Sequence, residues 1–154
     1  MNTGDDVQLV TFRVGSQEFA FDIHQIERIL RYQAPSPLPK APDFLEGVVQ
    51  YGGGAVPVVD LRKRFDLAAP VREDTRLMVL DLGDQRIGAL VDEVREVMRV
   101  DSMTIAAPGP MVSGLAAAYI AGIVSRPGRT IIVLNARRLF SATERLALTG
   151  IGSP

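Results

Sequence analysis

Two stretches of this chain occur twice, in the same order, and this duplication constrains the fold more than any single residue does. Residues 15–31 align without a gap on residues 83–99, and the strand-turn-strand pattern of residues 47–65 returns in residues 122–140. A chain that repeats its strand and turn chemistry most simply builds the same small unit twice. Two such units side by side leave a groove between them, which predicts a binding architecture rather than a catalytic one.

Length and composition agree with two small units that share an apolar seam. The chain has 154 residues, of which 47% are hydrophobic, and a domain of this length buries about 68–70% of the surface that its unfolded chain exposes. The 17 basic and 18 acidic residues leave a net charge of −1, so no long-range field attracts nucleic acid or an anionic membrane. A partner must then be held by shape and by local apolar contact.

The chain carries no cysteine and no signal for membrane insertion. The absence of cysteine excludes a disulfide framework and thiolate chemistry. Residues 1–6 are polar and acidic where a secretory signal would be basic and then apolar. The most hydrophobic stretch, residues 111–124, is shorter than the about 20 apolar residues of a membrane span. We therefore expect a cytoplasmic protein with no direct membrane insertion.

The pattern of strands and turns predicts an all-β fold built of two small barrels. Short apolar strands alternate with glycine turns, and helical segments are brief. The first unit spans about residues 7–70 and the second about residues 71–148, within a single domain that takes in residues 1–154. The boundary near residue 70 is soft, because the first strand either completes its own barrel or crosses to the other one.

Two polar residues at equivalent places in the repeat are expected to cap short helices. Asp60 directly follows an apolar strand, and Asn135 holds the same place in the second copy. A side-chain oxygen there accepts a free amide of the first helical turn, which is worth about 1 kcal/mol. Capping alone therefore explains the duplicated pair.

Apolar residues recur at helical spacing after the strands that follow the two repeated glycine turns. Such spacing is typical of core positions, which is the favoured interpretation, and an exposed contact surface is the alternative. The residues are Ile26, Ile29 and Leu30 in the first copy and Val94, Val97 and Met98 in the second.

Residue types that carry catalysis are scarce. His24 is the only histidine, which excludes a metal site with two or three imidazoles, and no serine lies in a nucleophile elbow. Residues 52–54 are three glycines that join two strands, so they predict a hairpin turn rather than a phosphate loop. We predict no catalytic residue, no metal and no cofactor, and an enzyme that uses His24 with nearby carboxylates is the alternative from another class.

Six segments of the chain carry a family pattern, and the most specific lies in residues 44–65 with the run Val56-Pro57-Val58-Val59-Asp60. The segments are residues 10–15, 19–29, 42–49, 56–62, 119–123 and 131–135. In them the chain closely resembles the CheW family, the coupling proteins of bacterial chemosensory arrays. The resemblance extends from about residue 7 to about residue 148, which is essentially the whole chain.

The resemblance implies two five-stranded, SH3-like barrels packed on a shared hydrophobic seam, with short helices and no enzymatic activity. Members of the family bridge the cytoplasmic helical-hairpin tip of chemoreceptors to the regulatory domain of a CheA-type histidine kinase. That domain is built like CheW itself, so other CheW-like domains are further candidate partners. Receptor contact in the family falls along the groove between the barrels, and motif position places Ile26, Arg28 and Gly47 near it here.

The chain departs from the family in one hairpin turn. The usual Asn-Leu-Arg-Gly is replaced by Gln50, Tyr51, Gly52 and Gly53, so an arginine tied to receptor and array contacts has become Gly52. The change removes a five-donor guanidinium fork, while Tyr51 offers a flat amphipathic ring. These four residues complete the predicted partner-binding set. The alternative to a standard coupling protein is a divergent one, for a non-motility chemosensory pathway, with altered or absent receptor binding.

Overall fold

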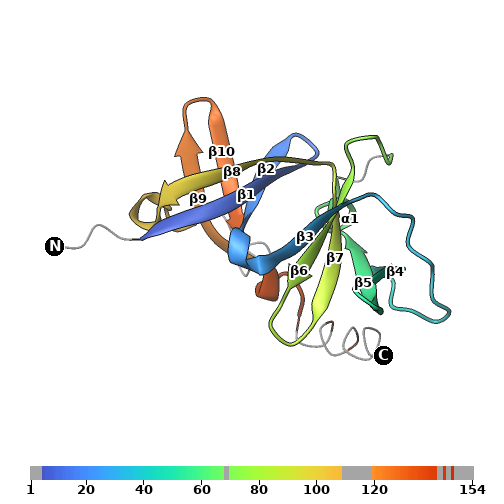
Figure 1. The fold of residues 1–154 in the computed structure, drawn as a ribbon. Helices are drawn as coiled ribbons and strands as arrows, with labels where there is room; N and C mark the ends of the chain where they lie inside the picture. Colours follow the sequence, from blue (N-terminus) through green and yellow to red (C-terminus); the bar gives the residue numbers. More distant parts are fainter. Residues whose placement is uncertain (1–4, 68–69, 109–118, 142–143, 145–146, 148–154) are drawn as a thin grey trace.

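The described part of the chain folds almost entirely into β-strands. The computed structural model describes residues 5–67, 70–108, 119–141, 144 and 147. Within these residues ten strands form two five-stranded sheets (Figure 1). The all-β prediction with two five-stranded units is therefore confirmed. Each curved sheet is called a barrel below.

Barrel A has the strand order β8-β1-β2-β10-β9, and barrel B has the order β3-β6-β7-β5-β4. The strands of barrel A are β1 (Asp6–Val14), β2 (Gln17–Asp22), β8 (Glu93–Asp101), β9 (Ile120–Arg126) and β10 (Arg129–Leu134). The strands of barrel B are β3 (Ile26–Arg31), β4 (Leu45–Tyr51), β5 (Gly54–Asp60), β6 (Arg76–Asp81) and β7 (Arg86–Val91). The helical segments are α1 (Leu61–Arg64) and 3₁₀ turns at Ile23–Gln25, Ser102–Thr104 and Ala136–Arg138.

The strands divide between the barrels differently from the two predicted halves of the chain. Barrel B takes β3 to β7, which lie consecutively in residues 26–91, while barrel A takes β1 and β2 together with β8 to β10. The 3₁₀ turn at Ile23–Gln25, capped by the Asp22 carboxylate, turns the chain so that β3 pairs with β6 of the following unit. Residues 68 and 69, just before the expected boundary, and residue 148, the expected end of the second unit, lie outside the described residues.

Each half of the chain contributes its first two strands to one barrel and its last three strands to the other, so the sequence repeat is preserved in the fold. Strands β1 to β5 correspond in order to β6 to β10, and replacing each strand by its counterpart converts one sheet order into the other. The parallel pairs follow the same rule, since Ala20 pairs with Val133 and the equivalent Gly88 pairs with Val58. The molecule therefore has an approximate two-fold relation between its barrels, and residues related by it are called equivalent below.

The largest hydrophobic cluster lies between the barrels. It joins Phe12 of barrel A to Met78 and Leu80 of barrel B, all of which are fully buried. Smaller clusters fill each barrel, around Leu9 in barrel A and around Leu77 in barrel B. Burial of one such side chain contributes about 1.5–3 kcal/mol. The seam cluster confirms the predicted shared hydrophobic seam, and it fixes the position of one barrel against the other.

Both predicted helix caps are present. The Asp60 carboxylate accepts the amide of Arg62 at the start of α1, and the Asn135 side chain accepts the amide of Arg137. The first of these caps also takes part in a buried ion pair, which the second does not.

Candidate functional site

An exposed apolar surface crosses the seam between two strands at the sheet edges. Strands β3 and β8 each lie at one end of their sheet order. The side chain of Ile29 on β3 is 40% exposed, and that of its equivalent on β8, Val97, is 55% exposed. Ile26 and Val94, also equivalent, pack against the seam cluster beside them. These four residues are called the apolar strip.

The strand register explains why the strip faces the seam. Ile29 lies opposite Met78, and Val97 lies opposite Val10. Both opposing residues belong to the seam cluster, so the four side chains share its side of the sheets. Ile29 and Val97 extend this cluster to the surface instead of closing it.

The favoured interpretation of these positions as core was wrong for Ile29 and Val97. Residues three apart on a regular strand face opposite sides. In β3 a register shift inserts Glu27, and in the β1–β8 pair a shift inserts Arg95, so the residues three apart return to the same side. A bulged strand thereby imitates the spacing of a helix. Leu30 and Met98, one position further along, do pack into the barrel interiors.

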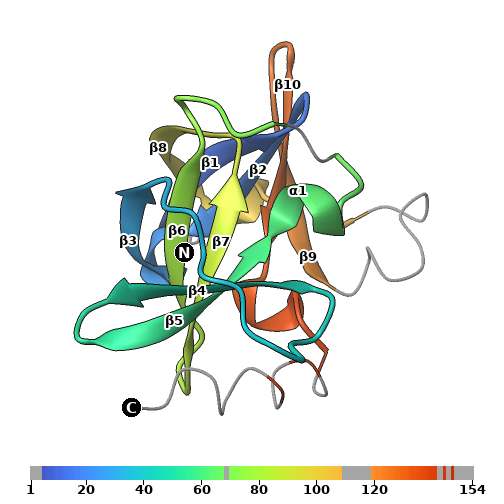
Figure 2. The same ribbon diagram turned by 90° about the vertical axis from the view of Figure 1, so that its right-hand side faces the viewer.

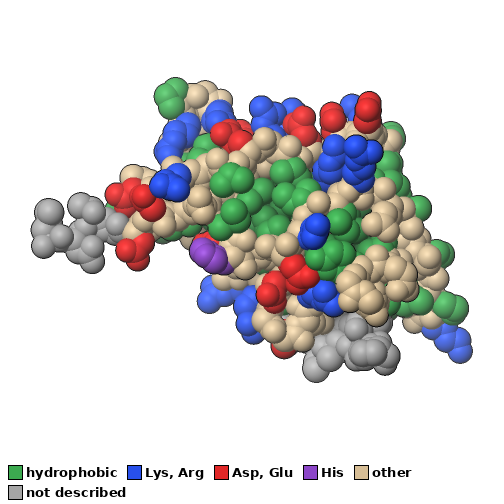
Figure 3. Space-filling view, in the orientation of Figure 1, with side chains coloured by type: hydrophobic (Ala, Val, Ile, Leu, Met, Phe, Trp, Pro, Cys, Tyr) green, Lys and Arg blue, Asp and Glu red, His purple; other side chains and the backbone are tan. Residues whose placement is uncertain are grey.

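Figure 3 shows hydrophobic side chains gathered over the middle of this face, between β8 and β3 in the orientation of Figure 1. Charged side chains lie around the margin of this area. Scattered apolar residues are normal on protein surfaces, whereas a contiguous apolar area with a polar rim marks an interaction site. The strip is therefore a candidate docking surface to which both barrels contribute.

A second group of residues surrounds the turn between β4 and β5. The guanidinium of Arg86, on β7, lies over the ring of Tyr51 at 5.4 Å from its centroid and donates to Glu27 Oε2 at 3.2 Å. Burial raises the pKa of Tyr51, and a hydrogen bond to Glu27 raises it further. Among the predicted residues, Tyr51 thus belongs to a polar cluster that links β3, β4 and β7. The nearby charge of Arg28 acts in the opposite sense and lowers the pKa of Tyr51.

Gly52 and Gly53 form the tip of this hairpin, beside the exposed Gln50. Both glycines have left-handed backbone, with φ of 61° and 81°. A Cβ atom at Gly52 would lie 3.2 Å from Arg86 Nη1, whereas at Gly53 it would meet nothing within 4 Å. The guanidinium of Arg86 therefore occupies the space beside the position where the family carries an arginine. The sequence alone could not reveal this neighbour, because Arg86 comes from a distant strand.

Gly47 is buried, unlike the turn residues. Its φ is 148°, and a Cβ atom there would lie 2.3 Å from the Ser36 carbonyl oxygen. The segment at Ser36 bridges to Val48 over this glycine. The equivalent Gly122 is covered in the same way by Ile105 and Ala106. The duplicated glycine therefore has a packing role, and direct contact of Gly47 with a partner stays a prediction.

The structure brings the seven predicted residues to three places rather than one. Ile26 lies on the apolar strip, Gly47 lies under the Ser36 segment, and Arg28 with Gln50 to Gly53 surrounds the β4–β5 turn. The exposed Ile29 and Val97 extend the candidate surface beyond the predicted set. Their equivalence in the repeat was the signal that could have identified them.

A groove of about 360 Å³ lies between the barrels at α1. Phe19, Ile132 and Leu134 of barrel A line one side, and Phe65 and Leu67, which follow α1, line the other. Figure 2 shows α1 and β9 on the side of the molecule opposite β3 and β8. None of the seven predicted residues lines this groove, so the two inter-barrel surfaces are separate.

Residues considered for chemistry lie elsewhere. The His24 side chain is 89% exposed, and its Nδ1 lies 2.9 Å from Asp22 Oδ1. The described residues contain no group of three or more His, Cys, Asp and Glu side chains that could hold a metal ion. No helix among the described residues is long and apolar enough to cross a membrane.

Two barrels held by a common core, with an apolar surface spanning both, define a protein-binding scaffold. The sequence-family model of the CheW-like domain matches residues 8–144 of this chain. Over 152 residues the chain is 30% identical to a chemotaxis protein CheW of Treponema pallidum, covering 96% of this chain and 89% of that protein. It is 29% identical over 140 residues to the protein FrzA of Myxococcus xanthus, covering 89% and 87% of the two chains.

The fold agrees with these relatives. The crystal structure of the scaffolding protein TtCheW from Thermoanaerobacter tengcongensis superposes with a TM-score of 0.81 at 27% identity, covering 91% of each chain. The chain belongs to the CheW-like family, and the resemblance noted in the sequence is confirmed. Its relatives are chemotaxis and scaffolding proteins, which supports a coupling adaptor of chemotaxis signalling and agrees with the prediction that it is not an enzyme.

Proposed function

We propose that this protein is a non-catalytic adaptor that couples the cytoplasmic tips of chemoreceptors to the regulatory domain of a CheA-type histidine kinase. It acts in the cytoplasm, at membrane-associated receptor arrays. The observation that carries the proposal is the apolar strip, to which equivalent residues of both barrels contribute. Family membership supports the choice of partners.

The strip suits the apolar face of a helix. A helix that binds in this way places its apolar residues along one face and leaves its polar face in water. With a net charge of −1, the chain has no overall field to hold such a partner, so local contact must supply the affinity. Individual contacts of modest strength are enough in an array, because multivalency raises the effective affinity.

The test is binding of the full-length chain to two probes from the same genome: a soluble receptor fragment that contains the helical-hairpin tip, and the isolated kinase regulatory domain. We expect both to bind. In Val97→Glu and Ile29→Glu variants the receptor fragment should bind at least about tenfold more weakly, because docking would bury an unpaired charge. Both variants should still bind the kinase regulatory domain if that domain contacts a surface other than the apolar strip.

A matched control is Val71→Glu, since Val71 is 45% exposed and lies outside the strip. This variant should bind the receptor fragment like the unmodified chain. Failure of the folded, unmodified chain to bind either probe at tens of micromolar would contradict the proposal.

The second candidate is a divergent coupling protein of a non-motility pathway, with altered or absent receptor binding. Gly52 in place of the family arginine favours it. In this case the kinase regulatory domain binds and the receptor fragment does not, with no difference between the unmodified chain and Val97→Glu. The same pair of probes therefore separates the two candidates.

A further inference from the structure

The two ends of the apolar strip differ in charge, although its apolar residues are related by the two-fold. Arg31 follows Ile29 by two residues on β3, and the equivalent Arg99 follows Val97 by two residues on β8. Residues two apart on a strand share a face. An exposed arginine thus stands beyond each end of the strip, on the same side as its apolar residues.

The partners across the strands break this symmetry. Arg31 lies directly opposite Arg76 of β6, whereas Arg99 lies opposite Gln8 of β1. Directly opposed residues in an antiparallel pair have Cβ atoms about 4.5–5.5 Å apart, and like charges in this arrangement destabilise the sheet. Only the end of the strip on barrel B carries such a pair.

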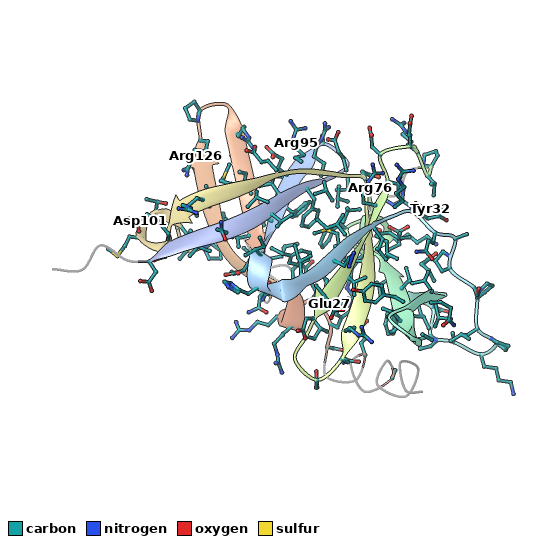
Figure 4. All side chains as sticks on the ribbon, viewed as in Figure 1. Glu27, Tyr32, Arg76, Arg95, Asp101 and Arg126 are labelled. Carbon is teal, nitrogen blue, oxygen red and sulfur yellow. The ribbon has the colours of Figure 1, made fainter. Side chains whose placement is uncertain are left out.

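The charge of the pair is not neutralised by the described residues. Arg76 Nη1 donates to the carbonyl oxygens of Glu73 at 2.7 Å and Thr75 at 3.0 Å, which are backbone groups. Arg31 is exposed and forms no ion pair within the described part of the chain. Figure 4 labels Arg76 near the end of β3 that leads to Tyr32, and Figure 3 shows Lys and Arg side chains at the same margin of the hydrophobic area.

We propose that Arg31 and Arg76 form an anchor for a carboxylate of the helical partner that docks on the apolar strip, and that this anchor sets the direction in which the partner lies. The inference deepens the proposed function and rests on it. A carboxylate between two guanidinium groups accepts charge-assisted hydrogen bonds and removes their repulsion. Since the apolar strip pairs Ile26 and Ile29 with the similar Val94 and Val97, the difference in charge between its ends is the feature that most clearly distinguishes the two directions.

The anchor predicts opposite effects on stability and on binding. Arg31→Glu replaces a like-charge pair by an ion pair with Arg76, so the variant should unfold at an equal or higher urea concentration than the unmodified chain. The same substitution should weaken binding of the receptor-tip fragment about tenfold or more, because a carboxylate then faces a carboxylate. A loss of affinity without a loss of stability cannot come from misfolding.

The experiment compares full-length Arg31→Glu and Arg76→Glu with the control Arg99→Glu, using the soluble receptor-tip fragment at low and high salt. We expect the first two to lose affinity, with a loss that shrinks as salt screens the charges, and Arg99→Glu to stay within about twofold. Replacing the contacting acidic residue of the fragment by Lys should restore binding to Arg31→Glu.

Each other outcome has a definite meaning. If Arg31→Glu and Arg76→Glu bind like the unmodified chain while Val97→Glu does not bind, the anchor is wrong and the proposed function stands. If Arg99→Glu loses as much affinity as Arg31→Glu, the directional role is wrong. If Val97→Glu also binds normally, docking on the strip itself fails.

Discussion

Arg62 Nη1 lies 3.4 Å from Asp92 Oδ1, and this contact joins barrel B to the segment that returns to barrel A. The guanidinium of Arg62 also forms two bonds of 2.9 Å to the Asp60 carboxylate. The second oxygen of Asp92 accepts the amide of Gly15 at 2.7 Å, in the turn between β1 and β2. A continuous series of polar contacts, from Asp60 through Arg62 and Asp92 to Gly15, therefore crosses the seam beside the hydrophobic cluster.

Replacing Arg62 should destabilise the fold strongly. The side chains of Arg62 and Asp60 are only 5% and 3% exposed, so Arg62→Met leaves a buried carboxylate without its cation. Removal of one partner from a buried pair costs about 3–5 kcal/mol. Urea unfolding at neutral pH, followed by circular dichroism, measures this loss.

The matched control is Arg137→Met, because Arg137 is equivalent to Arg62 in the repeat but exposed. The cap at Asn135 uses the backbone amide of Arg137 and survives the change. We expect a difference within about 0.5 kcal/mol of the unmodified chain. Equal effects of the two substitutions would show that the network at Arg62 adds nothing to stability.

Substitution of the two duplicated glycines should be costly to different degrees. At Gly47 an added Cβ meets the Ser36 carbonyl oxygen at 2.3 Å, and the backbone is left-handed. At Gly122 the nearest atoms are Ile105 Cγ2 at 2.4 Å and the Ala106 carbonyl oxygen at 3.1 Å, but the backbone is not left-handed, so only the crowding has to be relieved. We expect Gly47→Ala to lose about 3 kcal/mol and Gly122→Ala about 1–2 kcal/mol in urea unfolding.

Gly54→Ala is the control for both, since nothing lies within 4 Å of an added Cβ and its φ is not left-handed. It should be neutral or slightly stabilising, because alanine narrows the unfolded ensemble. If Gly47→Ala is as stable as Gly54→Ala, the packing role of the buried glycine is refuted, and a role in partner contact gains weight.

Stability should fall in acid through Glu18. Its carboxylate accepts two bonds from Arg129, at 2.9 and 2.8 Å, and the hydrogen bonding to Arg129 lowers the pKa of Glu18 below 4.5 despite its burial. The folded state thus binds the proton more weakly than the unfolded state does. The resulting stability is present above pH 4.5 and is lost as the pH falls through the lowered pKa.

A Glu18→Gln variant checks this sign. It should be less stable than the unmodified chain at neutral pH, and the difference between the two should shrink as the pH falls below 4.5. Glu73→Gln serves as the control, because Glu73 is exposed and its carboxylate forms no ion pair with any residue that the structure describes; the bond from Arg76 is to the backbone carbonyl oxygen of Glu73. A constant difference across the pH range would contradict the assignment to Glu18.

The sequence predicted the elements better than their pairing. The duplicated turns, strands and caps follow from local chemistry, which Asp60 and Asn135 express directly. Which strand lies beside β3 is a matter of long-range packing, since its partner β6 comes from the other half of the chain. Local patterns therefore left open whether the first strand crosses to the other barrel, and the structure shows that β1 pairs with β8 of the second half.

The candidate site shows the same limit. Ile26, a predicted partner-binding residue, lies on the apolar strip, whereas the interpretation of Ile29 and Val97 as core was wrong because a bulge reproduces helical spacing. Arg86 was not singled out at all, since its place beside Gly52 depends on the pairing of β5 with β7. The information that sequence reasoning lacked is tertiary in both cases.

Restoring an arginine at position 52 should disturb the cluster around it before it adds a new contact. An added Cβ at Gly52 lies 3.2 Å from Arg86 Nη1, so the Arg86 guanidinium must shift slightly and then lies beside a second positive charge. Gly53→Arg is the matched control, because its backbone is also left-handed and its surroundings are open. Both changes carry the left-handed cost of about 1–2 kcal/mol, and Gly52→Arg should lose about 0.5 kcal/mol more from the like charge of Arg86.

A double-mutant cycle isolates this extra cost. In an Arg86→Ala background the two arginine substitutions should become equal in urea unfolding, since the competing guanidinium is gone. If Gly52→Arg still loses more than Gly53→Arg there, the conflict lies elsewhere in the hairpin. Receptor binding of Gly52→Arg is then best compared in both backgrounds, because a gain that appears only without Arg86 would mean that the two guanidinium groups compete for one position.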